Sequence, residues 1–306
     1  MSAPRYHPPS VVYWMLSSKC VDDQMLLAPS PRVRFVIMLW LSRLQTRYDV
    51  EIVGFVFMGD HFHIVLRLRM SRLPAIMQSF KSGLAKALNK VHDRRGAFWM
   101  ERYHDDALLD DASVVTHVNY MHANPVRAHL VARADEYPGI SSWKAYAEDL
   151  ISLSETYFDE AQWLAAGGVE SKRARYTQTA TVTIGRPPGW DSLSAQGRRR
   201  AVAACVSEMR AEERRCAVER GEAREVPTVR ALVDRDPRSR AKSPKRSART
   251  KRASGTDAQL ELFEEAYREV MLAYRAASAA FRATGVLGPF PAGTYPPRLM
   301  YALLES

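Results

Sequence analysis

The segment FVFMGDHFHIVLRL, residues 55–68, constrains the fold more than any other part of the chain. Side chains alternate between the two faces of an extended strand, so every second residue from Phe62 to Leu68 lies on one face, and all of these are apolar. His61 and His63 fall together on the opposite face. The sequence therefore predicts a strand that buries one face in a core and presents two imidazoles on the other.

Strand-like and helix-like segments alternate through the first 131 residues. Short apolar, β-branched runs indicate strands, and apolar residues at helical spacing indicate helices. Gly59 and Asp60 separate two of the strands and suit a tight hairpin. The expected strands are residues 11–16, 50–58, 61–69 and 96–111, and the expected helices are residues 29–50, 71–94 and 112–131. This order predicts an α+β fold with a ferredoxin-like, four-stranded antiparallel sheet and helices on one face.

Charge and histidine content divide the chain into two unlike halves. From Ser171 to Thr256 there are 22 Lys and Arg against 9 Asp and Glu, an excess larger than the net charge of +10 of the whole chain. All eight histidines lie between His7 and His129. Imidazole chemistry is therefore expected in the first half and phosphate binding in the second. The basic excess favours a nucleic acid over an acidic membrane surface as partner.

Composition suggests four regions. A first domain is expected at residues 1–150, followed by a basic, mainly helical extension at 151–235. Residues 236–256 are low in complexity, basic and almost free of apolar side chains, which predicts a disordered linker. Residues 257–306 should form a C-terminal helix and a Pro-rich tail.

The cysteines and the hydropathy pattern exclude other classes of protein. Three widely spaced cysteines, without a Cys-x-x-Cys pair, support neither a disulfide framework nor a structural zinc site. No stretch reaches the length of about 18 uninterrupted apolar residues that a membrane span needs, and the N-terminus lacks the pattern of a secretory signal. We expect a cytoplasmic protein without membrane contact.

His61 and His63 are close enough on one strand face for both imidazoles to bind one divalent ion. The alternative is two half-exposed histidines on a polar sheet face. Tyr120 and Asn124 lie one helical turn apart and off the apolar stripe of their helix, which suits a nucleophile beside a metal-bound phosphate. Alternatively, Tyr120 packs at a domain boundary and Asn124, before Pro125, caps a helical turn.

Five blocks, MGDHFHIVLRL, SFKSGLAKALNK, GAFWMERYHDDAL, NYMHANPVRAHLV and YPGISSWKAY, occur in this order. In order and spacing they resemble the single-tyrosine HUH transposases of the IS200/IS605-like superfamily, in particular the REP-associated tyrosine transposase branch. The resemblance covers about residues 11–146. It departs at the first strand, VVYWMLSSKC, where relatives often have a His-Val-Thr-like sequence, and at Gly59-Asp60, where Pro-Asn is commoner.

The resemblance implies that residues 1–150 are an HUH catalytic domain. His61 and His63 would be metal ligands for Mg²⁺ or Mn²⁺, and Tyr120 the nucleophile. Asn124 would be a third ligand, where some relatives have Gln. The implied activity is that of a metal-dependent endonuclease and strand transferase that forms a 5′-phosphotyrosine link to single-stranded DNA, at palindromes that fold as hairpins. A homodimer stays open as an alternative to a monomer.

The residues expected to contact DNA are Arg67, Arg102, His104, Arg127, Arg198, Arg199 and Arg200. Trp99 and Tyr103 could stack on unpaired bases, and the alternative is that they are core aromatics. The three consecutive arginines could likewise form only a solvated helix face.

Two other functions compete with DNA cleavage. The first is a non-catalytic, nucleic-acid-binding regulator with an RRM-like sheet, since such domains also combine an exposed sheet face with basic tails. They carry aromatics on the central strands, whereas this chain has His61 and His63 there. The second, a two-histidine phosphodiesterase, needs two His-x-Thr or His-x-Ser motifs, and neither histidine stands in one.

Overall fold

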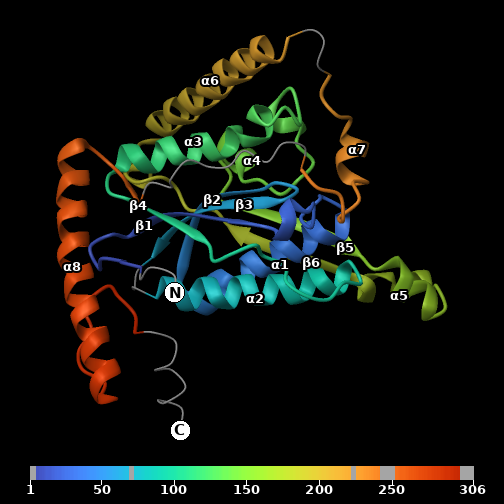
Figure 1. The fold of residues 1–306 in the computed structure, drawn as a ribbon. Helices are drawn as coiled ribbons and strands as arrows, with labels where there is room; N and C mark the ends of the chain where they lie inside the picture. Colours follow the sequence, from blue (N-terminus) through green and yellow to red (C-terminus); the bar gives the residue numbers. More distant parts are fainter. Residues whose placement is uncertain (1–4, 69–71, 222–224, 242–251, 297–306) are drawn as a thin grey trace.

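The computed structural model describes residues 5–68, 72–221, 225–241 and 252–296. Figure 1 shows a central sheet between two layers of helices, with a long helix beside one edge. The strands are β1 (Tyr13–Lys19), β2 (Val50–Phe57), β3 (His61–Leu68), β4 (His104–Leu108), β5 (Ser152–Phe158), β6 (Thr177–Thr183) and β7 (Ala253–Ser254). The helices are α1 (Pro31–Tyr48), α2 (Leu73–Val91), α3 (Asp111–Arg127), α4 (Trp143–Ala147), α5 (Glu160–Ala165), α6 (Ala195–Arg220), α7 (Val229–Val233) and α8 (Asp257–Thr284). Short 3₁₀ turns lie at Val21–Asp23, Ala134–Glu136, Glu170–Tyr176 and Trp190–Ser192.

The central sheet has five strands in the order β2-β3-β1-β4-β7. The first four strands along the chain are antiparallel to their neighbours, with the connections of a split βαβ unit. The prediction of four strands was incomplete, because β7 pairs in parallel with β4 from the far end of the chain. β7 has only two residues, too few for a periodic pattern to indicate a strand.

Helices cover both faces of the sheet, so the predicted one-sided arrangement is wrong (Figure 1). Phe62, on the apolar face of β3, contacts Phe80 of α2 edge-on. On the opposite face α3 packs against β2 and β3. That face also carries Met15 and Val65, which are paired across β1 and β3 and are 6% and 0% exposed. Apolar side chains on the histidine face need a cover, and α3 provides it.

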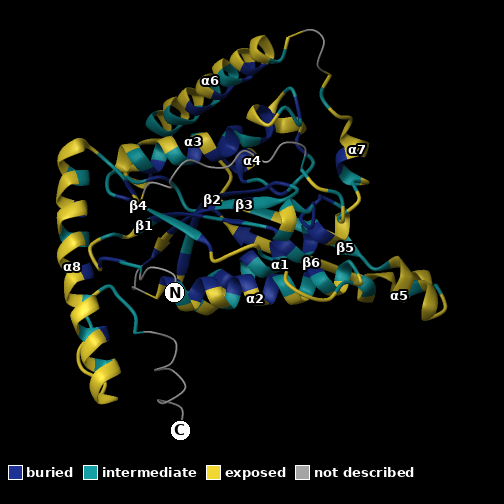
Figure 2. Ribbon diagram, viewed as in Figure 1, coloured by how far each residue is buried: buried dark blue, intermediate teal, exposed yellow. Residues whose placement is uncertain are grey.

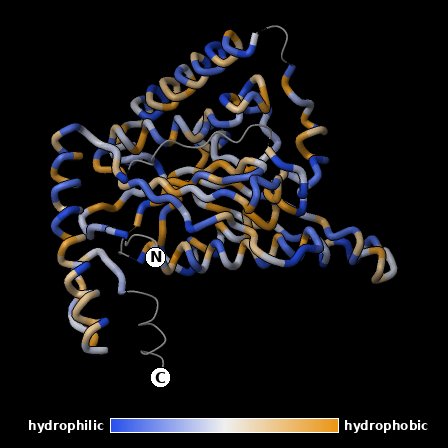
Figure 3. The backbone as a smooth tube through the Cα atoms, viewed as in Figure 1, coloured by the Kyte–Doolittle hydropathy of each residue, from blue (hydrophilic) through white to orange (hydrophobic). Residues whose placement is uncertain are grey.

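α3 can approach the sheet closely because β2 has a glycine at the crossing point. A Cβ on Gly54 would lie 2.6 Å from the Cε atom of Met121, so a larger residue would force the Met121 side chain to shift. The pairing of β2 with β3 is irregular between Ile52 and Gly54, which is typical of a bulge. Figures 2 and 3 show the result, a buried and largely apolar centre between the two helix layers.

The predicted hairpin at Gly59-Asp60 is confirmed. The Met58 N–H donates to the His61 carbonyl at 2.8 Å, which closes a two-residue turn between β2 and β3. Glycine is needed here for space: a Cβ on Gly59 would lie 2.6 Å from the sulfur of Met25. The turn therefore fixes where β3 begins, at His61.

Replacing Gly83 by Ala should destabilise the fold by about 1–3 kcal/mol. A Cβ at this position in α2 would lie 2.0 Å from the Cη2 atom of Trp40 in α1, a rigid ring that cannot move aside locally. The gain in helix propensity of about 1 kcal/mol is smaller than this overlap costs. Urea unfolding measures the change. The exposed neighbour Ser82→Ala is the control and should stay within about 0.5 kcal/mol of the parent.

The extension at residues 151–235, predicted to be mainly helical, also contains a β-hairpin. β5 and β6 pair antiparallel and pack on α1, where Tyr157 stacks on Phe35 and Glu155 pairs with Arg34 at 2.8 Å. Their solvent face is a ladder of Ser and Thr side chains. Alternation of hydroxyl and larger residues over seven positions was the available signal for these strands.

The predicted linker, residues 236–256, is described only at its two ends, and residues 242–251 lie outside the described residues. At one end the Met25 N–H donates to Ser239 and the Ala241 N–H to Asp23. At the other end the Ala107 N–H donates to Arg252. The end of the predicted Pro-rich tail, residues 297–306, also lies outside the described residues. None of the described helices combines the length and apolar character required to cross a membrane.

Candidate functional site

His61 and His63 point to the sheet face that α3 partly covers. Their ring centroids are 5.1 Å apart, with the ring planes almost perpendicular at 87°, and both side chains are half-buried. Across β1 their direct partners are Lys19 and Ser17. Direct partners in an antiparallel pair share a face, so two imidazoles, a hydroxyl and an ammonium group line this part of the sheet.

His63 is held in the neutral form. Burial, followed by the positive potential of His61, lowers its pKa to about 3. Its Nδ1 atom is buried and has no hydrogen-bond partner in the described part of the chain. A neutral imidazole with an unused ring nitrogen is the form that binds a metal ion.

His61 differs because it has a carboxylate partner. Its Nδ1 lies 2.7 Å from Oδ1 of Asp60, the second residue of the β2–β3 turn. Burial alone would raise the pKa of Asp60, but the hydrogen bond and charge of His61, the charge of Lys19 and a backbone hydrogen bond together hold the pKa below its ordinary value. The sequence placed Asp60 in the turn but did not indicate this contact.

α3 brings the predicted nucleophile to the histidine side of the sheet. His117 of α3 is close enough to His63 to lower its pKa electrostatically. Tyr120 and Asn124 follow His117 at successive turns, on the same flank of the helix. Tyr120 is 44% exposed, whereas the Nδ2 atom of Asn124 is buried and has no partner among the described residues. α3 runs through Pro125, so Asn124 lies inside the helix and does not cap a new turn.

Arg127 and α6 complete the surroundings of Tyr120. The Arg127 guanidinium lies 4.6 Å from the centroid of the Tyr120 ring and forms an ion pair with Glu212 of α6 at 3.4 Å. α6 also receives a hydrogen bond from Asn119 of α3 at Glu208. The basic extension is therefore attached to the helix that carries Tyr120, a contact that no local sequence pattern indicates.

Two of the predicted DNA contacts on the sheet already have protein partners. Arg67 bonds to Glu51 at 3.1 Å and lies over the ring of Tyr13. His104 lies in the same cross-strand row as His63 and Ser17, and it bonds to Glu101 at 2.7 Å.

The other predicted contacts lie outside the sheet. Arg102 is exposed at the start of the β4 segment. In α6, Arg199 and Arg200 are exposed, whereas Arg198 turns inward and donates to the Leu193 carbonyl at 2.7 Å.

Tyr103 is packed in the core, as the alternative interpretation expects, and Trp99 is half-buried against that core. Trp99 meets Phe62 edge-on with ring centroids 5.4 Å apart and donates its Nε1–H to the Lys81 carbonyl at 2.9 Å. Tyr103 is 6% exposed. A cation lies over a face of each ring, Lys81 Nζ at 5.3 Å from the Trp99 centroid and the Arg5 guanidinium at 4.1 Å from the Tyr103 centroid.

His122 is a structural residue of the site that the sequence did not indicate. It is 1% exposed, its Nε2 lies 2.7 Å from the Ser142 hydroxyl, and Ser142 accepts from the Phe55 N–H of β2 at 2.8 Å. This chain of bonds ties α3 to β2. Burial lowers the pKa of His122 to about 3, so the imidazole stays neutral in the folded protein.

Stability should depend on pH through His122. In the unfolded chain its pKa returns to about 6.5, so the unfolded state binds a proton below that pH and the folded state does not. The contribution of His122 to the free energy of unfolding is therefore greatest above about pH 6.5, and it falls by about 1.4 kcal/mol per pH unit below that pH. Urea unfolding of the parent and of His122→Gln at pH 7.5 and 5.5 measures this. The advantage of the parent should shrink by about 1.4 kcal/mol at the lower pH, and an unchanged difference would contradict it.

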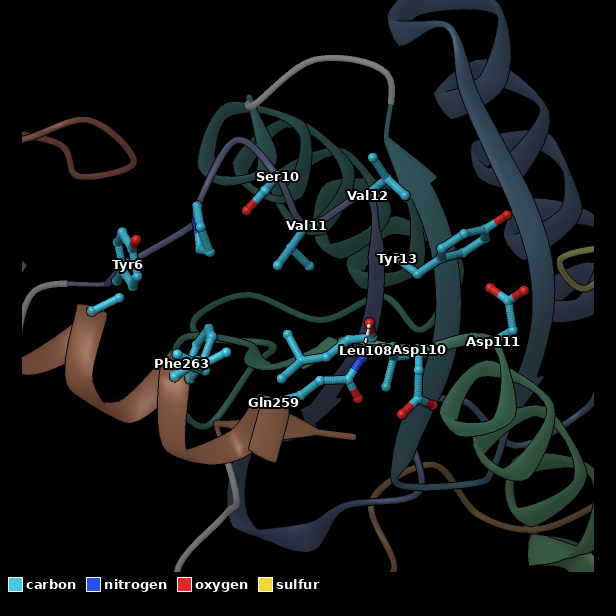
Figure 4. Close-up of a pocket in the computed structure, with 14 residues that line it drawn as sticks. Tyr6, Ser10, Val11, Val12, Tyr13, Leu108, Asp110, Asp111, Gln259 and Phe263 are labelled. Carbon is cyan, nitrogen blue, oxygen red and sulfur yellow. Dashed lines mark hydrogen bonds between the residues drawn. The ribbon is translucent and has the colours of Figure 1, made fainter. Parts of the chain in front are cut away.

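Among the described residues, no group of three or more His, Cys, Asp or Glu side chains is placed to hold a metal ion. A separate groove of about 440 Å³ lies between the N-terminal segment, the end of β4 and α8 (Figure 4). It is lined by aromatic and aliphatic side chains with Asp110 and Asp111 at one end, and by none of the predicted site residues. The Asp110 carboxylate caps α3 through the Ser113 N–H at 2.7 Å.

One part of the chain is similar to known proteins. Residues 32–124 match the family model described as IS200-like transposase. A curated protein of Haemophilus influenzae, described as a REP-associated tyrosine transposase, is 24% identical over an alignment of 102 residues that covers 30% of this chain and 58% of that protein. The chain thus matches little more than half the length of this relative.

Two solved structures are similar in part. The first, described as a REP-associated tyrosine transposase bound to a REP hairpin, has a TM-score of 0.41 and 17% identity and covers 48% of this chain and 86% of its own. The second, described as a transposase of Deinococcus radiodurans, has a TM-score of 0.29 and 15% identity and covers 36% and 91%. The matched segment, residues 32–124, contains both paired histidines and Tyr120, and it is the part of the chain that is similar to IS200-like transposases.

Proposed function

We propose that the protein is a metal-dependent endonuclease and strand transferase for single-stranded DNA, with Tyr120 as nucleophile. What supports this proposal is that His61 and His63 share one sheet face, that His117, on the α3 flank that bears Tyr120, acts electrostatically on His63, and that all of them lie in the segment that matches the IS200-like transposase model. An imidazole pair and a phenol are the groups that a phosphotyrosine mechanism needs.

His61, His63 and Asn124 would hold Mg²⁺ or Mn²⁺. The residues fit a cation, since His63 is neutral and its Nδ1 is unused in the described chain, while Asn124 would contribute its Oδ1 oxygen. Two imidazoles and an amide leave room for phosphate and water oxygens. When bound, the ion supplies Lewis-acid polarisation of a nonbridging phosphate oxygen.

Tyr120 would carry the covalent step. Its oxygen loses a proton and bonds to phosphorus, the bond to the 3′-oxygen breaks, and that oxygen takes up a proton to become a free 3′-hydroxyl. The bond energy is kept in the 5′-phosphotyrosine, so a 3′-hydroxyl can reverse the step and join strands without a nucleotide cofactor. The Arg127 guanidinium lies 4.6 Å from the ring centroid, so a cation lies against the face of the Tyr120 ring.

Hairpin DNA is the proposed substrate. The curated relative is described as REP-associated, and the resemblance to that branch implies palindromes that fold as hairpins. In this chain the exposed arginines of α6 offer phosphate contacts close to α3, since α6 packs along that helix. An RRM-like binding role has less support, because α3 buries Met15 and Val65 on the face where such a domain would stack bases.

The affinity for hairpin DNA should fall as the salt concentration rises. Arg199 and Arg200 should contribute to this salt dependence. Changing both to Gln is expected to reduce the slope of log K against log salt by about 1 for each phosphate that is no longer neutralised, close to 2 in total. Fluorescence anisotropy with a labelled hairpin at NaCl concentrations from about 50 to about 300 mM measures it. Arg43→Gln is the control, since Arg43 is an exposed residue of α1 and lies over Trp40 in the opposite helix layer. Equal slopes for all three proteins would remove α6 from the DNA interface.

The activity itself is tested with Mn²⁺ and single-stranded DNA from the region around the protein's own gene, containing a palindrome. A covalent protein–DNA adduct that survives a denaturing gel, together with a released strand ending in a 3′-hydroxyl, is the expected result. Binding without cleavage in Mn²⁺ and in Mg²⁺ would favour the non-catalytic regulator.

A further inference from the structure

The hydrogen bond between Asp60 and His61 determines which nitrogen of His61 carries a proton. The Asp60 carboxylate lies 2.7 Å from Nδ1. An ionised carboxylate only accepts hydrogen bonds, so Nδ1 must be the donor, and a neutral imidazole protonated at Nδ1 has its lone pair on Nε2. A metal ion binds this lone pair, so the tautomer decides whether His61 can be a ligand through Nε2.

Backbone contacts hold Asp60 in place. The Cys20 N–H donates to the Asp60 carbonyl at 2.7 Å, and the Leu27 N–H donates to Gly59 at 2.8 Å. The turn is closed by the bond from Met58 to His61 at 2.8 Å. The Asp60 side chain is only 14% exposed. Its carboxylate is therefore fixed relative to the imidazole by the sheet itself.

The surroundings of His61 and His63 thus differ. His63 is kept neutral by burial, and no described residue bonds its Nδ1. His61 is 24% exposed, and its ring is fixed by a charged hydrogen bond to Asp60. In metal sites, a carboxylate behind a histidine ligand fixes the orientation of the ring and increases its basicity.

We propose that Asp60 is a positioning residue that holds His61 in the Nδ1-protonated tautomer, so that Nε2 is presented to a divalent cation. The inference rests on the metal role given to His61 in the proposed function. Asp60 itself does not touch the cation or the DNA.

The proposal is tested first on metal-free protein. ¹⁵N NMR of histidine-labelled protein distinguishes the two tautomers by the shifts of the ring nitrogens, and His61→Gln assigns the signals. The parent should show His61 protonated at Nδ1, and Asp60→Ala should lose that preference. Asp60→Asn keeps an acceptor oxygen and should largely retain it, which also covers the case in which the Ala variant does not fold.

Calorimetric titration with Mn²⁺ in the absence of DNA then measures the consequence. Asp60→Ala should bind Mn²⁺ roughly 10- to 100-fold more weakly than the parent, with Asp60→Asn between them. Asp23→Asn is the matched control, because Asp23 also lies beside Lys19, bonding it at 3.2 Å, but has no contact with His61. It should bind Mn²⁺ like the parent.

The outcomes separate the two proposals. An unchanged His61 tautomer in Asp60→Ala, or unchanged Mn²⁺ affinity despite a changed tautomer, would overturn the role of Asp60 while the parent still binds metal. A parent that binds no Mn²⁺ would overturn both the inference and the metal role of the histidines. Neither measurement depends on DNA cleavage, so loss of cleavage alone cannot be mistaken for either result.

Discussion

Tyr120→Phe should abolish the covalent protein–DNA adduct and reduce strand cleavage by a factor on the order of 10⁴ or more, the size of effect seen when a covalent nucleophile is removed. Phenylalanine keeps the ring but lacks the oxygen that would bond to phosphorus. The protein should fold normally, because Tyr120 is 44% exposed and the ring contact with Arg127 remains. Hairpin affinity should stay within a few-fold of the parent. Cleavage and adduct formation on a denaturing gel measure the effect.

Tyr13→Phe is the matched control for this variant. Tyr13 is also a tyrosine with an arginine over its ring, Arg67 at 5.7 Å, and it lies on the same face of β1 and β3 as the histidines. It begins β1 at the far end from Ser17 and lines the groove near α8. Full cleavage by Tyr13→Phe with none by Tyr120→Phe is expected. The assignment of Tyr120 as nucleophile would fail if Tyr120→Phe cut DNA at the rate of the parent.

His63→Ala should cause the second large loss, at least roughly 100-fold in Mn²⁺ affinity and in cleavage rate. The imidazole is neutral, and its Nδ1 has no partner in the described chain, so its removal breaks no protein hydrogen bond at that atom. Stability should therefore change much less than metal binding. Calorimetry with Mn²⁺ and urea unfolding of the same sample separate the two effects.

His92→Gln serves as the control for His63→Ala. His92 ends α2, and its Nε2 bonds to the Leu26 carbonyl at 2.8 Å, away from the His61 and His63 pair. Its replacement should lower stability without changing Mn²⁺ affinity. Equal losses of metal binding in both variants would show that the effect comes from unfolding and not from a missing ligand.

The sequence predicted the parts of the fold that repeat over several residues. The alternation along β3 indicated which face holds His61 and His63, and the Gly59-Asp60 hairpin followed from turn chemistry. The helical stripe of α3 separated Tyr120 from the buried residues. These are local patterns, and a single element is enough to show them.

The parts that the sequence did not predict depend on contacts between distant elements. The contact of α3 with the histidine face places the Met121 side chain against Gly54 of β2, which no periodicity reveals. β7 pairs with β4 across a separation of well over a hundred residues. The packing of Trp99 against Phe62 is also set by tertiary structure, because an aromatic in an extended segment is equally compatible with base stacking.

Within the site, the sequence indicated the residues with the expected chemistry but not the neighbouring residues that hold them in place. Each of three site residues is held by one polar contact with another residue: His61 by Asp60, Arg127 by Glu212 and His122 by Ser142. Asp, Glu and Ser are common surface residues, so their presence in the sequence does not indicate such a contact. Such supports are visible only once the chain is folded. The resemblance to a known family does not imply these contacts either.

Mapping the covalent attachment by mass spectrometry tests the central claim most directly. The protein is incubated with Mn²⁺ and a hairpin-containing single strand, the DNA is digested to a short remnant, and the protein is cut into peptides. We predict a nucleotide joined through a 5′-phosphate to Tyr120, in the peptide that spans α3. A remnant on any other residue, or efficient cleavage without a covalent remnant, would contradict the claim that Tyr120 is the nucleophile.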